Sequence, residues 1–336
     1  MIRTMPPLRW GILGTGAVAT AFAEDQPLAG AAVRGVASRD GRRALAFARD
    51  HGIAMAFDGY AELCESDDID VVYIATPHPF HVSHALIALE AGKHVLVEKP
   101  VAMNASGAEL LFDRAAHLGL FCMEAMWVRF LPHLAFVRAM LKEHAIGNVR
   151  GMAIDVSRSL APSPESRLLD PALGGGALLD MGVYATSIAV DLLGPGAVAA
   201  AKARWRENSV DAATSFLSVH SGEVMCTASV SADGVGSNQV VIAGDRGSLV
   251  VGPRWNMPSD VVVRDAEDRE LRRFDSRPAG RGMWLQSLAV QDAIQRGLKQ
   301  HPLMPWSQSL QSLILLDNVR RIIGLTYEGE SPFGCR

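Results

Sequence analysis

Cysteine is scarce in the 336-residue chain, and the four that it has lie far apart. No CxxC pair occurs among them, so the sequence signals neither a zinc site nor a disulfide framework. We therefore expect all four to be reduced and buried: Cys64, Cys122, Cys226 and Cys335.

An excess of positive charge is also missing, because 32 basic side chains stand against 36 acidic ones and the formal net charge is −4. A strongly basic surface marks nucleic-acid binders, so we expect no nucleic-acid partner. The longest informative uncharged stretch, residues 71–89, contains three histidines and two prolines, whereas a membrane-spanning helix needs about 20 mostly apolar residues. Residues 1–9 lack the apolar core of a signal peptide, so the expected location is the cytoplasm.

What the chain does have is the composition of a globular protein, with 49% hydrophobic and 20% charged residues, so a sizeable core can form. A length of 336 residues predicts two domains of about 150 residues each. The texture of the sequence changes between residues 125 and 150. We place the boundary near residue 125, with one domain over residues 1–125 and a second over residues 126–336.

Short apolar runs alternate with helical segments in the first domain. Strands that lack polar alternation and are separated by helices indicate a parallel sheet that is buried on both faces. This pattern predicts a doubly wound parallel (Rossmann) α/β sheet. The expected strands are 8–13, 31–37, 71–75 and 94–97, and the expected helices are 17–25, 42–51, 81–91 and 105–118.

The repeat changes to two residues after Gly147. Residues 224–230 alternate between apolar and mostly polar side chains, which is the pattern of a sheet with two different faces. Further strands are expected at 237–243, 248–251 and 261–264, with a turn at 244–247. We predict an α+β domain on an open, largely antiparallel sheet. Two helices should close the chain, the last with an apolar stripe from Leu315 to Ile323.

A glycine-rich turn of the form GxGxxA follows the first strand directly and opens a helix. Gly14 permits the tight turn, Gly16 lets a pyrophosphate approach the backbone, and the small Ala19 lets helix and strand pack closely. The helix N-terminus adds N–H groups and a favourable dipole for phosphate. An ordinary turn is the alternative, but the strand–turn–helix context favours a dinucleotide site. The expected contacts are Gly14, Thr15, Gly16, Ala17 and Val18.

The end of the second strand should contact the adenine ribose. An NAD enzyme would place Asp or Glu there, whereas this chain has Ser38 and Arg39, with Arg42 and Arg43 one turn later. Arginines suit a 2′-phosphate, so the expected cofactor is NADP, with NAD less favoured. Asp40 complicates this reading, because a solvated helix start could equally hold one aspartate and two arginines.

The segment His94–Pro100 reads HVLVEKP, a buried strand that ends in Glu98 and Lys99. Ligands of open α/β sheets bind outside the carboxyl ends of the strands, where Lys99 is expected. With the glycine turn, this segment resembles the large oxidoreductase family that includes glucose–fructose oxidoreductase and inositol dehydrogenase. The similarity spans nearly the whole chain, and its other motifs are YIATPHPFH at 73–81, EAMWVRF at 124–130 and GGGALLDMGVY at 174–184.

These motifs are most similar to the branch with dimeric dihydrodiol dehydrogenase and the NADP-dependent D-xylose dehydrogenases. The resemblance implies a catalytic pair of Lys99 and Tyr184, with Asp180 beside them. Many other members have histidine where Tyr184 stands, which disfavours an inositol dehydrogenase. The resemblance also implies which residues line the cofactor and the substrate cleft: Ala75, Thr76, Pro77, His78, His81, Glu98, Trp127 and Arg129.

Lysine and tyrosine side chains can both take part in acid–base chemistry. Oxidation of an alcohol needs a base for the hydroxyl proton, but free tyrosine titrates near about 10 and free lysine near about 10.4. A lysine ammonium within about 4–6 Å of a tyrosine favours its phenolate, whereas burial favours neutral lysine, so either group could accept the proton. We expect Tyr184 to be the acid/base, Lys99 its electrostatic partner and hydroxyl anchor, and Asp180 the residue that orients the substrate hydroxyl.

Each assignment has a structural alternative. Lys99 could bind only phosphate, and Tyr184 could be a core aromatic residue with a satisfied hydroxyl. Asp180 could cap its helix, while Trp127 and Arg129 could serve packing and the surface. The histidines at 78, 81 and 84 suggest a metal, but one lies in a loop and two are expected in a helix, so we predict no metal site.

The expected function is an NADP-dependent oxidoreductase that transfers a hydride between nicotinamide and a cyclic diol or aldose, such as a trans-dihydrodiol, D-xylose or D-glucose. Residues 1–125 would bind the nucleotide, and residues 126–336 the substrate and a second subunit through the open sheet. The alternatives are an enzyme with tightly bound nucleotide, like glucose–fructose oxidoreductase, and a non-catalytic sugar or nucleotide sensor. Specificity should reside in loops 160–173 and 253–260.

Overall fold

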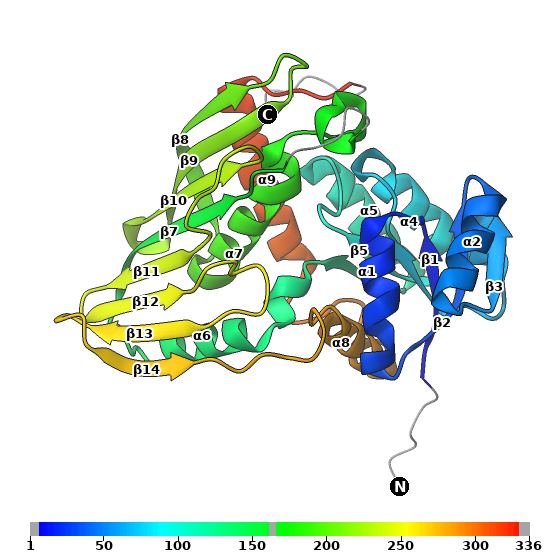
Figure 1. Cartoon of the computed structure of the whole chain (residues 1–336), viewed down its shortest axis with the longest axis horizontal. Coiled ribbons are helices and arrows are strands. Elements are labelled where there is room, and N and C mark those ends of the chain that lie inside the picture. The colour runs from blue at the N-terminus through cyan, green and yellow to red at the C-terminus, as the bar shows by residue number, and fades with distance from the viewer. Residues whose placement is uncertain (1–6, 161–165, 329–336) are drawn as a thin grey trace, which may run out of the picture. The chain divides into compact units, whose positions relative to one another are not determined.

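The computed structural model describes residues 7–160 and 166–328, which divide into two compact units (Figure 1). The first unit comprises residues 1–102, 106–127 and 279–306, and the second comprises 103–105, 128–278 and 307–336. Cys335 and most of the N-terminal segment considered above lie outside the described residues, as do positions 161–165 of the first specificity loop.

The first unit contains a six-stranded sheet in the order β3-β2-β1-β4-β5-β6, and all of its neighbouring strands are parallel. This confirms the predicted doubly wound fold. Its strands are β1 (Arg9–Leu13), β2 (Ala32–Ser38), β3 (Met55–Asp58), β4 (Val71–Ile74), β5 (His94–Glu98) and β6 (Cys122–Ala125). Its helices are α1 (Ala17–Asp25), α2 (Gly41–His51), α3 (Tyr60–Glu65), α4 (His81–Glu90), α5 (Ala105–Leu118) and α8 (Trp284–Gln295).

The strand order reverses between β1 and β4, which are neighbours although two strands separate them in sequence. Ligands of open α/β sheets bind at this switch point, outside the carboxyl ends of the strands. The backbone holds the ends of the central strands together: Gly14 N–H donates to Ala37 O at 2.9 Å, and Ala75 N–H donates to Leu13 O at 2.9 Å. The glycine turn after β1 and the loop after β4 are therefore fixed side by side.

The second unit is built on an eight-stranded sheet in the order β14-β13-β12-β11-β7-β10-β9-β8. Neighbouring strands are antiparallel except β7 and β10, which are parallel, so the predicted largely antiparallel sheet is confirmed as a mixed one. The strand expected from residue 237 begins at Val240. The strands are β7 (Val149–Ser157), β8 (Gly196–Trp205), β9 (Asp211–His220), β10 (Val224–Ser231), β11 (Val240–Gly244), β12 (Gly247–Val251), β13 (Val261–Asp265) and β14 (Glu270–Phe274).

Three helices cover one face of this sheet: α6 (Pro132–Lys142), α7 (Val183–Leu193) and α9 (Trp306–Ile323) (Figure 1). A π-helical turn, Leu178–Gly182, leads directly into α7. Within the described residues, Pro171–Leu193 is the one segment long and apolar enough to cross a membrane by composition, but 83% of its most apolar window is buried inside the protein. That burial is the behaviour of a core helix.

Three of the four cysteines lie in the described part of the chain. Cys64, Cys122 and Cys226 are free and buried, as expected. Burial raises the pKa of the Cys64 thiol to about 12, and the same cause raises that of Cys226 to about 12. These thiols are therefore protonated and unreactive at neutral pH.

Candidate active site

The glycine turn has the geometry that a pyrophosphate site requires. Gly14 has φ +108°, and a Cβ atom there would lie 2.7 Å from Ala75 O, so both its conformation and its surroundings demand glycine. Gly16 precedes α1 as its N-cap residue, and a Cβ atom there would have no atom within 4 Å. Open space thus adjoins a helix N-terminus that no side chain caps, which suits a phosphate.

Asp40 forms hydrogen bonds with one of the three arginines that follow β2, which is Arg42. Its Oδ1 accepts hydrogen bonds from Arg42 N at 3.0 Å and Arg42 Nε at 3.3 Å, and the hydrogen bond from the Arg42 side chain holds the pKa of this carboxyl below its usual value. Asp40 therefore caps α2 and occupies Arg42. Arg39 and Arg43 are exposed at the same edge, next to the buried Ser38.

Tyr60 and His84 lie near Arg39, and the sequence did not predict either as part of the nucleotide site. Burial lowers the pKa of His84, and the charge of Arg39 lowers it further. Burial raises the pKa of Tyr60 against the opposing effect of Arg39. The two rings lie 4.4 Å apart, and His84 Nδ1 is 2.9 Å from Thr76 Oγ1. Tyr60 lies on the six-residue helix α3, which is too short to give a periodic pattern in the sequence. His84 was considered from the sequence only as a possible metal ligand.

The loops after β4 and β5 are joined by His81, which is fully buried. Its Nδ1 is 2.7 Å from Pro100 O, and its Nε2 is 2.7 Å from Thr76 O. Both partners are backbone carbonyl oxygens, one from each loop. His81 thereby fixes the loop that carries Lys99 relative to the glycine turn's neighbour, Ala75.

Glu98, at the end of β5, is buried and holds the backbone beside Lys99. Its Oε2 accepts a hydrogen bond from Lys99 N at 3.1 Å, and its Oε1 accepts one from the hydroxyl of Tyr73. Lys99 itself is half-buried. His78 is buried near His81, with ring centroids 5.6 Å apart. Over residues 7–160 and 166–328 no three His, Cys, Asp or Glu side chains are grouped as a metal site.

Asp180 and Tyr184 are four residues apart in the second unit, one in the π-helical turn and the other in the first turn of α7. Each is 9% exposed, so both are largely buried and still reach the surface. Asp180 Oδ1 accepts a hydrogen bond from Arg167 Nη2 at 2.8 Å, an ion pair in which the arginine is half-exposed. Arg167 lies in a 3₁₀ turn within the predicted specificity loop 160–173. The sequence did not predict it as a partner of Asp180.

The ring of Tyr184 packs edge-on against Trp255, with centroids 6.5 Å apart and planes at 90°. Trp255 is fully buried, and its Nε1 donates to Asp155 O at 2.9 Å. His133 Nε2 lies 2.9 Å from Trp255 O, and burial lowers the pKa of this histidine to about 4, so it is neutral at pH 7. The second predicted specificity loop, 253–260, therefore supplies the packing surface for Tyr184.

The last two candidate residues differ in their surroundings. Trp127 is 7% exposed and belongs to the first unit. Arg129 belongs to the second unit and is fully buried, with its Nε donating to Ser187 Oγ at 2.9 Å and its Nη1 donating to Gln308. These partners favour a role for Arg129 in anchoring α7.

Comparison with known proteins identifies both parts of the chain. Residues 8–126 match the oxidoreductase family with an NAD-binding Rossmann fold, and residues 134–250 match the GFO/IDH/MocA C-terminal domain. The chain is 34% identical to trans-1,2-dihydrobenzene-1,2-diol dehydrogenase of Sus scrofa over 95% of its length and 98% of that protein. The human enzyme of the same name is 32% identical, again over 95% and 98%.

Solved structures agree with this similarity. KijD10, a 3-ketoreductase from Actinomadura kijaniata in complex with TDP-benzene and NADP, has a TM-score of 0.81 and 30% identity, covering 94% of this chain and 97% of KijD10. Levoglucosan dehydrogenase in complex with NADH and levoglucosan has a TM-score of 0.85 but only 20% identity, covering 95% and 97%, and so shares the fold.

The two glycines of the turn should respond differently to a methyl group. Gly14→Ala should lower the free energy of unfolding by about 1–3 kcal/mol, because it forces an L-residue into a strained conformation against Ala75 O. Gly16→Ala, with φ −87° and open space, should cost no more than about 1 kcal/mol as a poorer helix cap, yet weaken dinucleotide binding. Urea denaturation and nucleotide titration measure both effects. Equal losses of stability would contradict this account of the turn.

Proposed function

Because the chain belongs to the oxidoreductase family that joins an NAD-binding Rossmann fold to a GFO/IDH/MocA C-terminal domain, we propose that it is an NADP-dependent dehydrogenase of cyclic diols or aldoses. The observation that carries this proposal is the similarity to dihydrodiol dehydrogenases over 95% of the chain. Residues 1–125 serve the nucleotide, and residues 126–336 serve the substrate and a second subunit. The three cysteines in the described part of the chain are free and buried, which fits a cytoplasmic location.

The nucleotide is held at the switch point of the parallel sheet. The uncapped N-terminus of α1 takes the pyrophosphate, and Arg39 and Arg43 take the 2′-phosphate, since Asp40 is occupied by Arg42. NADP in the KijD10 complex supports this choice over NAD. The remaining contacts are Thr15, Ala17, Val18, Ser38, Ala75, Thr76, Pro77, His78, His81, Glu98, Lys99 and Trp127, with Arg129 as a buried support.

A bound nicotinamide would supply the acceptor for the hydride of the hydroxyl-bearing carbon. Tyr184 takes the hydroxyl proton on its phenolate oxygen, and the Lys99 ammonium stabilises that phenolate and anchors the hydroxyl. Asp180, which accepts a hydrogen bond from Arg167 Nη2 at 2.8 Å, accepts a further one from a second substrate hydroxyl. A pair of neighbouring hydroxyls is the feature that cyclic diols and aldoses share.

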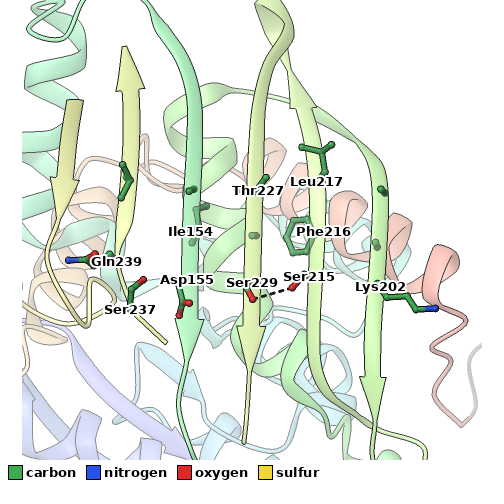
Figure 2. Close-up of a pocket in the computed structure, with 15 residues that line it drawn as sticks. Ile154, Asp155, Lys202, Ser215, Phe216, Leu217, Thr227, Ser229, Ser237 and Gln239 are labelled. Carbon is green, nitrogen blue, oxygen red and sulfur yellow. Dashed lines mark hydrogen bonds between the residues drawn. The ribbon is translucent and has the colours of Figure 1, made fainter. Parts of the chain in front are cut away.

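The open face of the second sheet is the proposed dimer surface. A shallow groove of about 590 Å³ crosses β11, β7, β10, β9 and β8, and Figure 2 shows some of its side chains, such as Leu217 and Thr227. Asp155 lies on β7, two strands away from Leu217 of β9, and Lys202 lies on β8, at the far side of the groove. A two-fold axis through the groove would bring Lys202 of one subunit to the partner's Asp155, so the surface is self-complementary.

The activity is tested with a panel of trans-dihydrodiols, aldoses and polyols, monitored by NADPH formation in parallel with NAD. We expect turnover with NADP, and a loss of about 10²–10⁴-fold in kcat for Tyr184→Phe and Lys99→Ala. Fluorescence titration should show that both variants still bind NADPH. An absence of turnover throughout the panel would overturn the proposal, and nucleotide that survives gel filtration would favour the enzyme that retains its cofactor.

The role of Arg39 is tested by Arg39→Ala. Loss of a charge-assisted bond to the 2′-phosphate, worth about 1.5–3 kcal/mol, should weaken NADP binding by about 10–150-fold and leave NAD binding nearly unchanged. Arg49→Ala is the matched control, because it removes the same charge from an exposed site on α2, the helix that follows Arg39. Equal effects of the two variants on NADP would exclude a specific phosphate contact.

The dimer surface is tested by Leu217→Asp. A buried, unpaired carboxylate would oppose association, so light scattering at micromolar concentration should change from dimer to monomer. Leu271→Asp on β14 makes the same change at a position that is already 54% exposed, outside the groove, and should leave the dimer intact. A monomeric wild-type protein would refute the proposed interface.

A further inference from the structure

Asp211, the first residue of β9, is a buried carboxylate in the second unit that the reaction as described does not use. Its side chain is fully shielded from solvent. Its Oδ2 accepts hydrogen bonds from Leu178 N at 2.8 Å and from Thr214 Oγ1 at 2.7 Å. Leu178 is the first residue of the π-helical turn that carries Asp180 and leads to Tyr184. Asp211 therefore contacts the start of the segment that holds two proposed catalytic residues.

The helical segment has no cap of its own. Ala177 stands at the N-cap position and offers no side-chain acceptor, so the first N–H groups need a partner from elsewhere. Asp211 supplies one from a different strand, 33 residues along the chain. A carboxylate at this end also interacts favourably with the helix dipole.

The glycine run before the helix makes room for this contact. Gly176 has φ +106°, and a Cβ atom there would lie 2.2 Å from Asp211 Oδ1. A Cβ atom at Gly175 would lie 2.8 Å from Asp170 O. Any side chain at 176 would therefore displace the carboxylate from Leu178 N–H. Residues 174–176 are the glycine run at the start of the GGGALLDMGVY motif. Glycine is needed at position 176 because a side chain there would collide with the Asp211 carboxylate.

The segment between Asp211's contact at Leu178 and Tyr184 is a π-helical turn, Leu178–Gly182. π-Helical turns are rare and are often found at functional sites. This one shifts the register between Leu178 and α7, and so sets the direction in which Asp180 and Tyr184 point. Burial raises the pKa of Asp211, because a charged carboxylate is less favoured in the protein interior than in water. The hydrogen bond to Leu178 N is the contact that fixes the start of the turn.

We propose that Asp211 is a positioning residue, which holds the π-helical turn at Leu178–Gly182 so that Asp180 and Tyr184 meet the substrate in the reactive geometry. The inference rests on the proposed dehydrogenase function for its catalytic consequence. Its structural part, the restraint on Leu178, stands on the hydrogen bond and the glycine run alone. An asparagine would keep an acceptor oxygen and the volume of the side chain, whereas alanine would remove both.

The test compares Asp211→Ala, Asp211→Asn and the control Ser218→Ala with wild type, at a temperature where all are folded. Ser218 is buried on the same strand and is 3.0 Å from His220 Nε2, so its variant also loses a buried hydrogen bond. For Asp211→Ala we expect kcat to fall by about 10–100-fold with the KM for NADP within twofold, as for a misplaced catalytic group. Asp211→Asn should recover most of kcat, and Ser218→Ala should keep it.

Two readouts separate positioning from general destabilisation. With a carbon-deuterated substrate, the isotope effect on kcat should increase in Asp211→Ala only, because the chemical step becomes slower. Amide hydrogen exchange of residues 177–184, measured without substrate, should accelerate at least tenfold in Asp211→Ala and remain near wild type in the other two variants.

The outcomes are distinguishable. Unchanged kcat and unchanged exchange in Asp211→Ala would overturn the inference, as would an equal loss of kcat in Ser218→Ala. An Asp211→Asn variant as inactive as Asp211→Ala would assign the role to charge and reject positioning. If wild type shows no turnover, the proposed function fails, and the exchange measurement still decides whether Asp211 restrains the turn.

Discussion

The peptide N–H groups at the start of a helix must find acceptors, and the two units of this protein meet that requirement in different ways. At α1 no side chain acts as a cap, and the adjoining space at Gly16 is open. At the turn before α7 a buried carboxylate from β9 serves as the cap. The first arrangement suits a bound phosphate, and the second suits a rigid support for reacting side chains.

Glycine is required in both places for the same reason, which is close approach to an oxygen atom. Gly14 faces the carbonyl of Ala75, and Gly176 faces the carboxylate of Asp211, each with positive φ. Two further buried polar residues of the first unit bond to the backbone. His81 joins the loops after β4 and β5, and Glu98 holds Lys99 N–H. Both proposed halves of the site are thus fixed through main-chain contacts.

The sequence predicted the features whose signal is local. The apolar runs of β1, β2, β4 and β5 and the glycine turn follow from short patterns, and so does the alternation of β10. The four-residue strand β3 is a partly exposed edge strand, and β6 contains a glutamate, so neither has a clear pattern. The parallel pairing of β7 with β10 depends on strands about 70 residues apart, which alternation does not encode.

The same limit applies to the candidate site. Lys99, Asp180 and Tyr184 were found through motifs, but Arg167, Trp255 and Asp211 support them through contacts that only the folded chain brings together. A carboxylate at the start of a strand gives no sign in the sequence that it caps a distant helix. Supporting residues of this kind are found from hydrogen-bond partners and burial.

The account depends on direct hydride transfer from a carbon that bears a hydroxyl, and an isotope experiment tests this most directly. Wild-type protein is incubated with NADP and a cyclic diol or aldose that carries deuterium on that carbon, and the nucleotide product is analysed by mass spectrometry. The account predicts NADPH that contains one deuterium at the nicotinamide ring. Reduced nucleotide without deuterium, or no reduced nucleotide with any such substrate, would contradict it.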